Sequence, residues 1–320
     1  MNRISMKHLR YFDALARHGH FGRAAEDCAI SQPALSVQIR ELEQLMGVPL
    51  VERGSRQIHL TGLGVEFAER AQAILRSVGE LEDLARAARG PYSGQFRFGI
   101  IPTIAPYLLS DIIKTLSVRL PGLELRPREA KTPVLVQDLL EARLDAAILA
   151  LPLSESSLHE EALFDEEFVL LRSAADVEKP VPKPDGLRKM QLLLLEEGHC
   201  FRDQAISYCS SNAVLPRNLM EGSSLSTLVQ MVGAGIGVTL IPEMAVGVEV
   251  RSAAVSIAHL PDPRPMRTVG MVWRKTNPLL EQLMQIADIV REIGLNKPAL
   301  PGDPSLVSDA DAAYPPSRFV

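Results

Sequence analysis

The residues whose side chains are best suited to carry out a chemical reaction lie together in one short stretch, residues 197–205 (EGHCFRDQA). Cys200 is the nucleophile there, and the thiolate form of a cysteine is the one that reacts with oxidants. Arg202 and the N-terminus of a helix predicted to begin at Asp203 favour a thiolate, whereas the charge of Asp203 opposes it. His199 is placed to donate a hydrogen bond to a bound oxidant. From these residue types alone, a reactive Cys200 and an ordinary structural Cys200 are equally good explanations.

The chain has two further cysteines, Cys28 and Cys209. Three cysteines are too few for a disulfide scaffold, and a pair that bonds in a reducing cytosol is more often transient than structural. Cys28 falls within a predicted helix and is expected to be a small buried apolar residue. Taken alone, Cys209 is also better explained as core. We expect neither a metal ion nor a cofactor.

Length and composition indicate a globular protein of roughly two domains. Of the 320 residues, 46% are hydrophobic and 23% charged. No signal peptide is visible, and the longest apolar stretch, 232–250, is interrupted by Pro242 and Glu243. We therefore expect a cytoplasmic protein that does not enter the membrane. Residues 1–60 have a net charge of +2 and the remainder −7, which fits a DNA-binding head on an acidic body.

The first 60 residues have the pattern of a helix-turn-helix. Apolar residues from Met6 to Ala16 recur at spacings of three and four and predict a first helix, and residues 21–28 predict a second. Ser31 is placed to cap a third helix, which Gly47 ends. The exposed face of this third helix is expected to enter the major groove of DNA. The residues on that face are Gln32, Pro33, Ser36, Val37 and Arg40. A generic helical subdomain with a charged surface is the alternative.

Residues 49–61 predict a β-wing with Arg53 and Arg56 at its tip, where arginines suit phosphate contacts or insertion into the minor groove. Thr61 is placed to cap a long helix that runs to about residue 89. Apolar residues recur along this helix in alternating steps of four and three, which predicts a dimerising coiled coil. These residues are Phe67, Ala71, Ile74, Val78, Leu81, Ala85 and Ala88.

From residue 95 the pattern changes to alternating strands and helices, which predicts βαβ units and a mainly parallel sheet. Strands are expected at 96–101, 123–128, 146–151, 168–171, 192–195, 238–241 and 268–273. Helices are expected at 106–120, 134–144, 203–211, 225–232 and 279–293. Residues 296–320 contain five prolines and are predicted to form a flexible tail.

The order of these parts, together with residues 31–36 (SQPALS), resembles the LysR-type transcription regulators up to about residue 295. The resemblance implies an α/β protein with a winged helix-turn-helix over residues 1–60, a linker and dimerisation helix over 61–89 and a regulatory domain over 90–295. In that family the regulatory domain consists of two Rossmann-like halves of the periplasmic-binding-protein type, with the sensing site in the cleft between them. Subdomain I is then about 90–164 and 268–295, and subdomain II about 165–267.

Within this family, residues 197–205 followed by Cys209 are similar to the hydrogen-peroxide sensors of the OxyR group. Residues 101–109 (IPTIAPYLL) and 163–166 (LFDE) are also similar. The resemblance implies that Cys200 is the peroxidatic cysteine, which forms a sulfenic acid, and that Cys209 is the resolving cysteine. Thr103 and Thr132 are carried over as residues that orient the peroxide, and Arg267 as an arginine near the reactive sulfur. Both threonines are equally well placed to be helix N-caps.

The spacing of the two cysteines makes a disulfide between them a conformational switch. Nine residues along a straight helix correspond to roughly 13 Å of rise, whereas a disulfide requires Cα atoms about 4.4–6.8 Å apart. If residues 203–211 are helical in the reduced protein, this segment must partly unwind for the bond to form.

The resemblance implies promoter DNA, further copies of the chain (a dimer through the linker helix and a tetramer), hydrogen peroxide and RNA polymerase as partners. It also implies activation of antioxidant genes, with glutaredoxin or thioredoxin as the reductant. Two alternatives remain. The first is a LysR-type regulator that binds a small metabolite in the same cleft, with incidental cysteines. The second is an enzyme, a thiol peroxidase fused to a DNA-binding head; we expect no enzyme, because nothing else in the sequence requires turnover.

Overall fold

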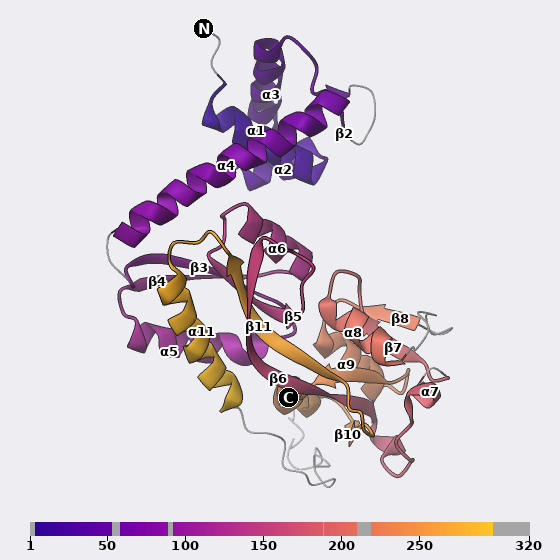
Figure 1. Ribbon diagram of the computed structural model, residues 1–320. Helices are drawn as coiled ribbons and strands as arrows, with labels where there is room; N and C mark the ends of the chain where they lie inside the picture. Colours follow the sequence, from indigo (N-terminus) through magenta and orange to yellow (C-terminus); the bar gives the residue numbers. More distant parts are fainter. Residues whose placement is uncertain (1–3, 53–57, 89–91, 188, 210–218, 297–320) are drawn as a thin grey trace, which may run out of the picture. The chain divides into compact units, whose positions relative to one another are not determined.

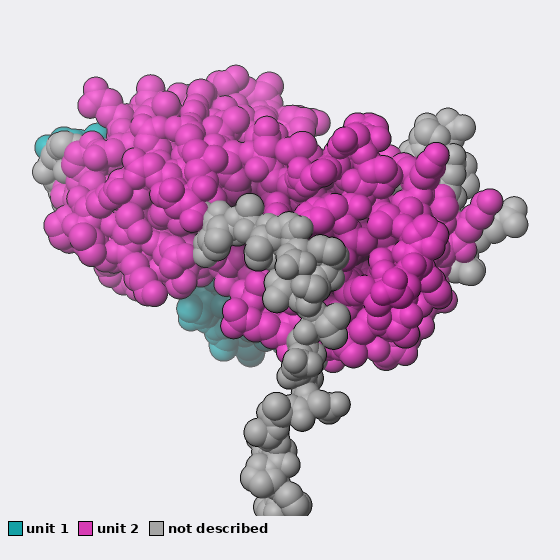
Figure 2. All heavy atoms as spheres, turned by 90° about the horizontal axis from the view of Figure 1, so that it is seen from below, with its two compact units in different colours: residues 1–90, 140–143, 276–278 teal, residues 91–139, 144–275, 279–320 magenta. Residues whose placement is uncertain are grey.

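The computed structural model describes residues 4–52, 58–88, 92–187, 189–209 and 219–296. The chain divides into two compact units (Figure 2). Unit 1 contains residues 1–90 together with 140–143 and 276–278, and unit 2 contains residues 91–139, 144–275 and 279–320. The expected wing tip with Arg53 and Arg56, the end of the long helix near residue 89 and the tail after residue 296 lie outside the described residues.

Unit 1 begins with three helices, α1 (Met6–His18), α2 (Phe21–Asp27) and α3 (Gln32–Met46) (Figure 1). As expected, the Ser31 hydroxyl caps α3 by accepting from the Ala34 N–H, and Gly47 ends the helix in the left-handed conformation. Leu35, Ile39 and Leu42 of α3 are buried against residues of α1 and α2. The three helices therefore share one apolar core.

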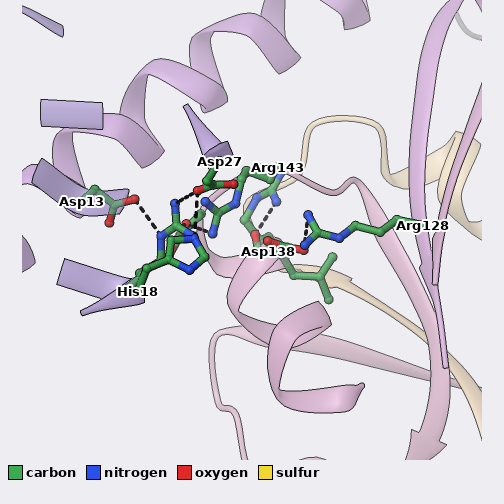
Figure 3. A network of polar contacts seen from close by, with 10 residues as sticks. Asp13, His18, Asp27, Arg128, Asp138 and Arg143 are labelled. Atoms are coloured by element: carbon green, nitrogen blue, oxygen red, sulfur yellow. Dashed lines mark hydrogen bonds and ion pairs between the residues drawn. The ribbon is translucent and has the colours of Figure 1, made fainter. Parts of the chain in front are cut away.

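An ion-pair cluster joins α1 to α2 (Figure 3). The Arg17 guanidinium lies 3.0 Å from the Asp13 carboxylate and 2.7 Å from the Asp27 carboxylate, and His18 lies 3.3 Å from Asp27. Burial raises the pKa of Asp27, but the hydrogen bond and charge of Arg17 outweigh it, so the net pKa is lowered. This cluster holds the first two helices together.

The chain continues through β1 (Val51–Glu52) and β2 (His59–Leu60), which pair antiparallel, into α4 (Gly62–Ala88). The Thr61 hydroxyl caps α4 by accepting from the Gly64 N–H, as expected. Phe67, which the heptad pattern assigned to a dimer seam, packs instead within unit 1, with its ring 5.2 Å from that of Phe12; Ala71 of the same pattern is buried. Farther along, Ile74 and Leu81 are exposed.

Unit 2 is built on a seven-stranded sheet with the order β10-β6-β11-β5-β3-β4, with β9 also paired to β6 (Figure 1). The strands are β3 (Gly94–Ile100), β4 (Leu123–Glu129), β5 (Ala146–Leu151), β6 (Leu158–Ser173), β9 (Thr239–Pro242), β10 (Val255–His259) and β11 (Met266–Arg274). A separate two-stranded sheet pairs β7 (Leu192–Leu195) with β8 (Leu219–Gly222).

The expectation of a mainly parallel sheet is wrong. In the large sheet only β4 and β5 lie parallel to β3, while β11 pairs antiparallel with β5 and β6, and β6 pairs antiparallel with β9 and β10. The reason is that β6 and β11 are long neighbouring strands that run in opposite directions between the two halves of unit 2.

Helices complete these two halves. The first half contains β3, β4, β5, α5 (Ala105–Arg119), α6 (Thr132–Leu140) and α11 (Leu280–Leu295), with α5 packed against α11. The second half contains β7 to β10, α7 (Pro184–Leu187), α8 (Cys200–Cys209), α9 (Leu225–Gly233) and α10 (Glu243–Glu249), with short 3₁₀ turns at Ala174–Asp176 and Val250–Ser252. The buried side chains of β7, α8 and α9 form one apolar core in this half. Across the described ranges, no helix is long and apolar enough to cross a membrane.

Candidate functional site

Cys200 is the first residue of helix α8 and Cys209 is the last. The helix was expected to begin at Asp203, so it begins three residues earlier than predicted, directly after the turn formed by residues 196–199. Cys200 is half-buried and is a free thiol. The position still suits an anion, because it lies at the positive end of the helix dipole, although the Arg202 N–H of this first turn already donates to the His199 carbonyl at 3.0 Å.

His199 lies beside Cys200 with its ring buried, at 5% exposure. Its Nε2 atom has no hydrogen-bond partner among the described residues. Burial lowers the pKa of His199, the charge of Lys131 lowers it further, and the Glu196 carboxylate acts in the opposite direction with a smaller effect. Burial and Lys131 together favour the neutral ring, whose unpartnered Nε2 is a donor or an acceptor according to the tautomer.

Arg202 and Phe201 fix the first turn of α8 to the neighbouring strands of the second half of unit 2. The Arg202 guanidinium donates to the carbonyl of Leu195 at 2.9 Å and to the Glu221 carboxylate at 2.6 Å, and so ties α8 to β7 and β8. The Phe201 ring packs edge-on against that of Phe168 at 4.8 Å between centroids. These contacts make Arg202 an anchor of helix α8. The sequence pattern suggested instead that Arg202 would be the charged partner of the Cys200 thiolate. Asp203 is exposed.

Arg267 of β11 is fully buried and occupies the centre of a polar cluster. Its guanidinium donates to the Glu166 carboxylate at 2.7 Å, to the Thr103 hydroxyl at 2.9 Å and to the Thr103 carbonyl at 3.1 Å. Its Cζ lies 6.0 Å from the centroid of the Phe201 ring, the residue next to Cys200. The structure thus connects Thr103 and Arg267 to the start of α8 through one aromatic ring.

The two threonines lie at the strand-to-helix junctions of the first half, as expected. Neither caps a helix with its side chain: α5 has Ile104 at its N-cap without a side-chain bond, and the Thr132 hydroxyl has no partner among the described residues. Because Arg267 donates to the Thr103 hydroxyl, the proton of that hydroxyl is left to donate elsewhere. These facts argue against the N-cap alternative for both residues.

Two residues of this region were missed by the sequence analysis. Glu166 belongs to the LFDE stretch, but its role as the partner of Arg267 depends on a contact across 101 residues of sequence. Lys131 precedes Thr132, and its ammonium reaches the turn before Cys200. Neither contact leaves a local signal, because both partners are ordinary charged residues far apart in the chain.

Cys28 has a different environment. It is partly buried in the core of unit 1, where burial raises the pKa of its thiol and the nearby charge of Asp27 raises it further. The thiol is therefore protonated at neutral pH, which fits the expected role as an apolar residue.

The DNA-binding candidates that the structure describes lie on one side of α3. Gln32, Pro33 and Arg40 are exposed and Ser36 is partly exposed, while the opposite side of the helix is buried. The Arg40 guanidinium donates to the Ser36 hydroxyl at 3.1 Å. Within unit 1, this side of α3 is therefore left accessible to a binding partner.

Comparisons with known proteins agree with this architecture. The family described as "Bacterial regulatory helix-turn-helix protein, lysR family" matches residues 6–65, and "LysR substrate binding domain" matches residues 89–293. The chain is 40% identical over 294 residues to the Escherichia coli "DNA-binding transcriptional dual regulator OxyR", which covers 90% of this chain and 95% of that protein.

Two similar solved structures are also OxyR proteins. A full-length OxyR variant from Pseudomonas aeruginosa shares 35% identity with a TM-score of 0.64, covering 90% of this chain and 95% of that one. A hydrogen-peroxide-bound mutant of Corynebacterium glutamicum OxyR shares 31% identity with a TM-score of 0.62, covering 92% and 93%. With the helix-turn-helix, the α/β body and these similarities together, the chain belongs to the LysR family of transcription regulators and, within it, to the OxyR group.

Proposed function

We propose that this protein is a hydrogen-peroxide-responsive, DNA-binding transcription activator that is switched by a reversible disulfide between Cys200 and Cys209. The observation that carries the proposal is the placement of a free, half-buried thiol at the start of α8, next to a buried histidine whose Nε2 has no partner among the described residues. Support also comes from the relatives, since E. coli OxyR is named a DNA-binding transcriptional regulator and the C. glutamicum OxyR structure holds hydrogen peroxide.

In the first step the Cys200 thiolate attacks one oxygen of the peroxide. An S–O bond forms and the O–O bond breaks, so that Cys200 becomes a sulfenic acid and the second oxygen leaves as hydroxide, which is protonated to water. Neutral His199 is positioned to donate a hydrogen bond to the leaving oxygen. The hydroxyls of Thr103 and Thr132 supply further donors that orient the peroxide, and Arg267 holds Thr103 in place.

In the second step the Cys209 thiolate attacks the sulfur of the Cys200 sulfenic acid. The S–S bond forms, the S–O bond breaks and water is released, so the two thiols have supplied the two electrons that reduce the peroxide. Because α8 spans both cysteines, a straight helix keeps their Cα atoms roughly 13 Å apart. Closure to the approximately 4.4–6.8 Å of a disulfide requires α8 to unwind. A dithiol reductant such as glutaredoxin or thioredoxin returns both cysteines to thiols.

The other segments of the chain bind DNA and assemble the regulator. Residues 1–60 bind promoter DNA through α3, with Arg53 and Arg56 of the wing as additional contacts. Residues 61–89 form the dimerisation helix and residues 90–295 the sensing domain. The exposed Ile74 and Leu81 of α4 support a dimer, because large apolar side chains at such positions are normally covered by a partner. Two dimers form the tetramer that engages RNA polymerase.

The test combines peptide mass spectrometry with DNA footprinting before and after one equivalent of peroxide. The parent protein should form the Cys200–Cys209 disulfide and change its footprint. Cys200→Ser should do neither, and Cys209→Ser should stop at a sulfenic acid that dimedone traps on Cys200. If Cys200→Ser changes its footprint with peroxide as the parent does, the proposal is wrong. A parent protein whose footprint does not change with peroxide would favour a metabolite in the cleft as the signal. Sustained peroxide turnover with a cellular reductant would instead indicate a thiol peroxidase.

A further inference from the structure

Lys131 connects the two halves of unit 2 at the turn that precedes Cys200. It lies between β4 and α6 in the first half, and its Nζ donates to the carbonyl oxygen of Glu197 in the second half at 3.0 Å. The same Nζ lies 3.5 Å from the Glu196 carboxylate. One side chain therefore holds both a main-chain and a side-chain oxygen of the turn.

The aliphatic part of Lys131 makes a third contact with this turn. Gly198 has a φ of +90°, a conformation that L side chains rarely adopt, and a Cβ built there would lie 3.2 Å from Cδ of Lys131. The lysine stem thus lies directly over the glycine. The turn is enclosed from the first half by a residue that is itself only one-third exposed.

The residues next to these contacts carry two unpartnered polar atoms. Thr132 follows Lys131 in the first half, and His199 follows Gly198 in the second. The Thr132 hydroxyl and the His199 Nε2 have no partner within the described part of the chain. A shift of one half relative to the other would move these two groups apart, and Lys131 is the side chain that joins the backbones on which they sit.

We propose that Lys131 is a positioning residue that aligns His199 and Thr132 across the two halves and thereby sets the rate at which Cys200 reacts with hydrogen peroxide. The inference rests on the proposed function of Cys200. It assigns Lys131 no contact with the peroxide, since its ammonium is committed to Glu196 and Glu197.

The electrostatics supply an independent readout. Lys131 and Glu196 are the charged groups that act on the pKa of His199, in opposite directions. Removal of the lysine charge should raise the His199 titration midpoint, whereas Glu196→Gln should lower it. Substitution of a lysine that lies away from this turn would leave the His199 midpoint unchanged, so the shift reports that the Lys131 charge acts on His199.

The experiment measures the rate of Cys200 sulfenic acid formation in a Cys209→Ser background, where the second step cannot occur. Lys131→Met should lower this rate roughly tenfold, because a small misplacement of reacting groups is costly. Lys131→Arg can still donate to Glu197 and pair with Glu196, and should recover the parent rate to within about threefold. Lys179→Met, which removes an exposed lysine paired with Asp176, is the matched control and should leave the rate unchanged. The His199 midpoint is followed in the same variants by NMR.

A Lys131→Met variant that keeps the parent rate would overturn the inference, whatever its His199 midpoint. So would a loss of rate that Lys131→Arg does not restore. A parent protein that forms no sulfenic acid at Cys200 would overturn the proposed function, so the two failures are distinguishable.

Discussion

Replacement of Arg267 by methionine should destabilise unit 2 strongly. The Arg267 side chain is fully buried and that of Glu166 is 6% exposed, so the substitution leaves a buried carboxylate with the Met244 N–H at 2.9 Å as its remaining partner in this cluster. Removal of one member of a buried ion pair costs roughly 3–5 kcal/mol. For a unit of this size each kcal/mol corresponds to about 2–4 °C, so the melting temperature should fall by roughly 6–20 °C.

Calorimetry of the reduced protein at pH 7 measures this loss, and a double-mutant cycle isolates the pair. Glu166→Gln alone leaves the Arg267 charge without its counter-ion, while the double variant leaves neither charge buried. The double variant should therefore be more stable than the sum of the two single losses, with a coupling of about 2 kcal/mol or more. If Arg267→Met costs less than about 1 kcal/mol and the cycle shows no coupling, the Arg267–Glu166 pair does not organise the cluster.

Three other outcomes are expected. Arg17 lowers the pKa of Asp27 in the folded protein, so the Asp27 carboxylate stabilises the fold above the unfolded carboxyl pKa, and this stabilisation is lost as the pH falls through the folded pKa. In urea titrations below about pH 4, the free energy of unfolding should therefore fall more steeply with pH for the parent than for Asp27→Asn. Equal slopes would contradict this. Cys28→Ser should keep the full peroxide response. Because the Cys28 thiol is protonated, alkylation at pH 7.5 should label Cys200 before Cys28, and faster labelling of Cys28 would refute this. Arg40→Ala should weaken binding to promoter DNA by about 1–3 kcal/mol in anisotropy titrations, and unchanged affinity would exclude this side of α3 as the contact surface.

The helices of unit 1 were predictable because their signals are local. The Ser31 cap and the Gly47 stop each act within one turn of the helix that they bound, so the sequence alone locates α3. The heptad pattern of α4 was harder to interpret, because core packing and dimerisation both require apolar residues at the same spacing. Phe67 shows the difference, since it contacts Phe12 within unit 1.

The sheet and the polar cluster depend on contacts that sequence patterns do not encode. The segment Leu158–Ser173 contains several acidic residues in its first part, and only its pairing with β11 shows that it is one continuous strand. The short strands β8 and β10 and the helix α10 were missed for the same reason. The motif singled out Cys200 and His199 as candidates, but the contact of Lys131 with the turn before Cys200 and that of Glu166 with Arg267 became visible only with the fold.

The helix that separates Cys200 from Cys209 also has a kinetic consequence for the proposed switch. Once Cys200 is a sulfenic acid, the disulfide can close only while the ten-residue α8 is open. During this waiting time small cellular thiols compete for the sulfenic acid: a first thiol forms a mixed disulfide with Cys200 and releases water, and a second thiol displaces Cys200 as a free thiol. The fraction of oxidised molecules that switch is then set by the ratio of the helix-opening rate to the competing reduction rate. A brief exposure to peroxide is mostly erased and a sustained one accumulates, so the stability of one helix sets the dose at which the regulator responds.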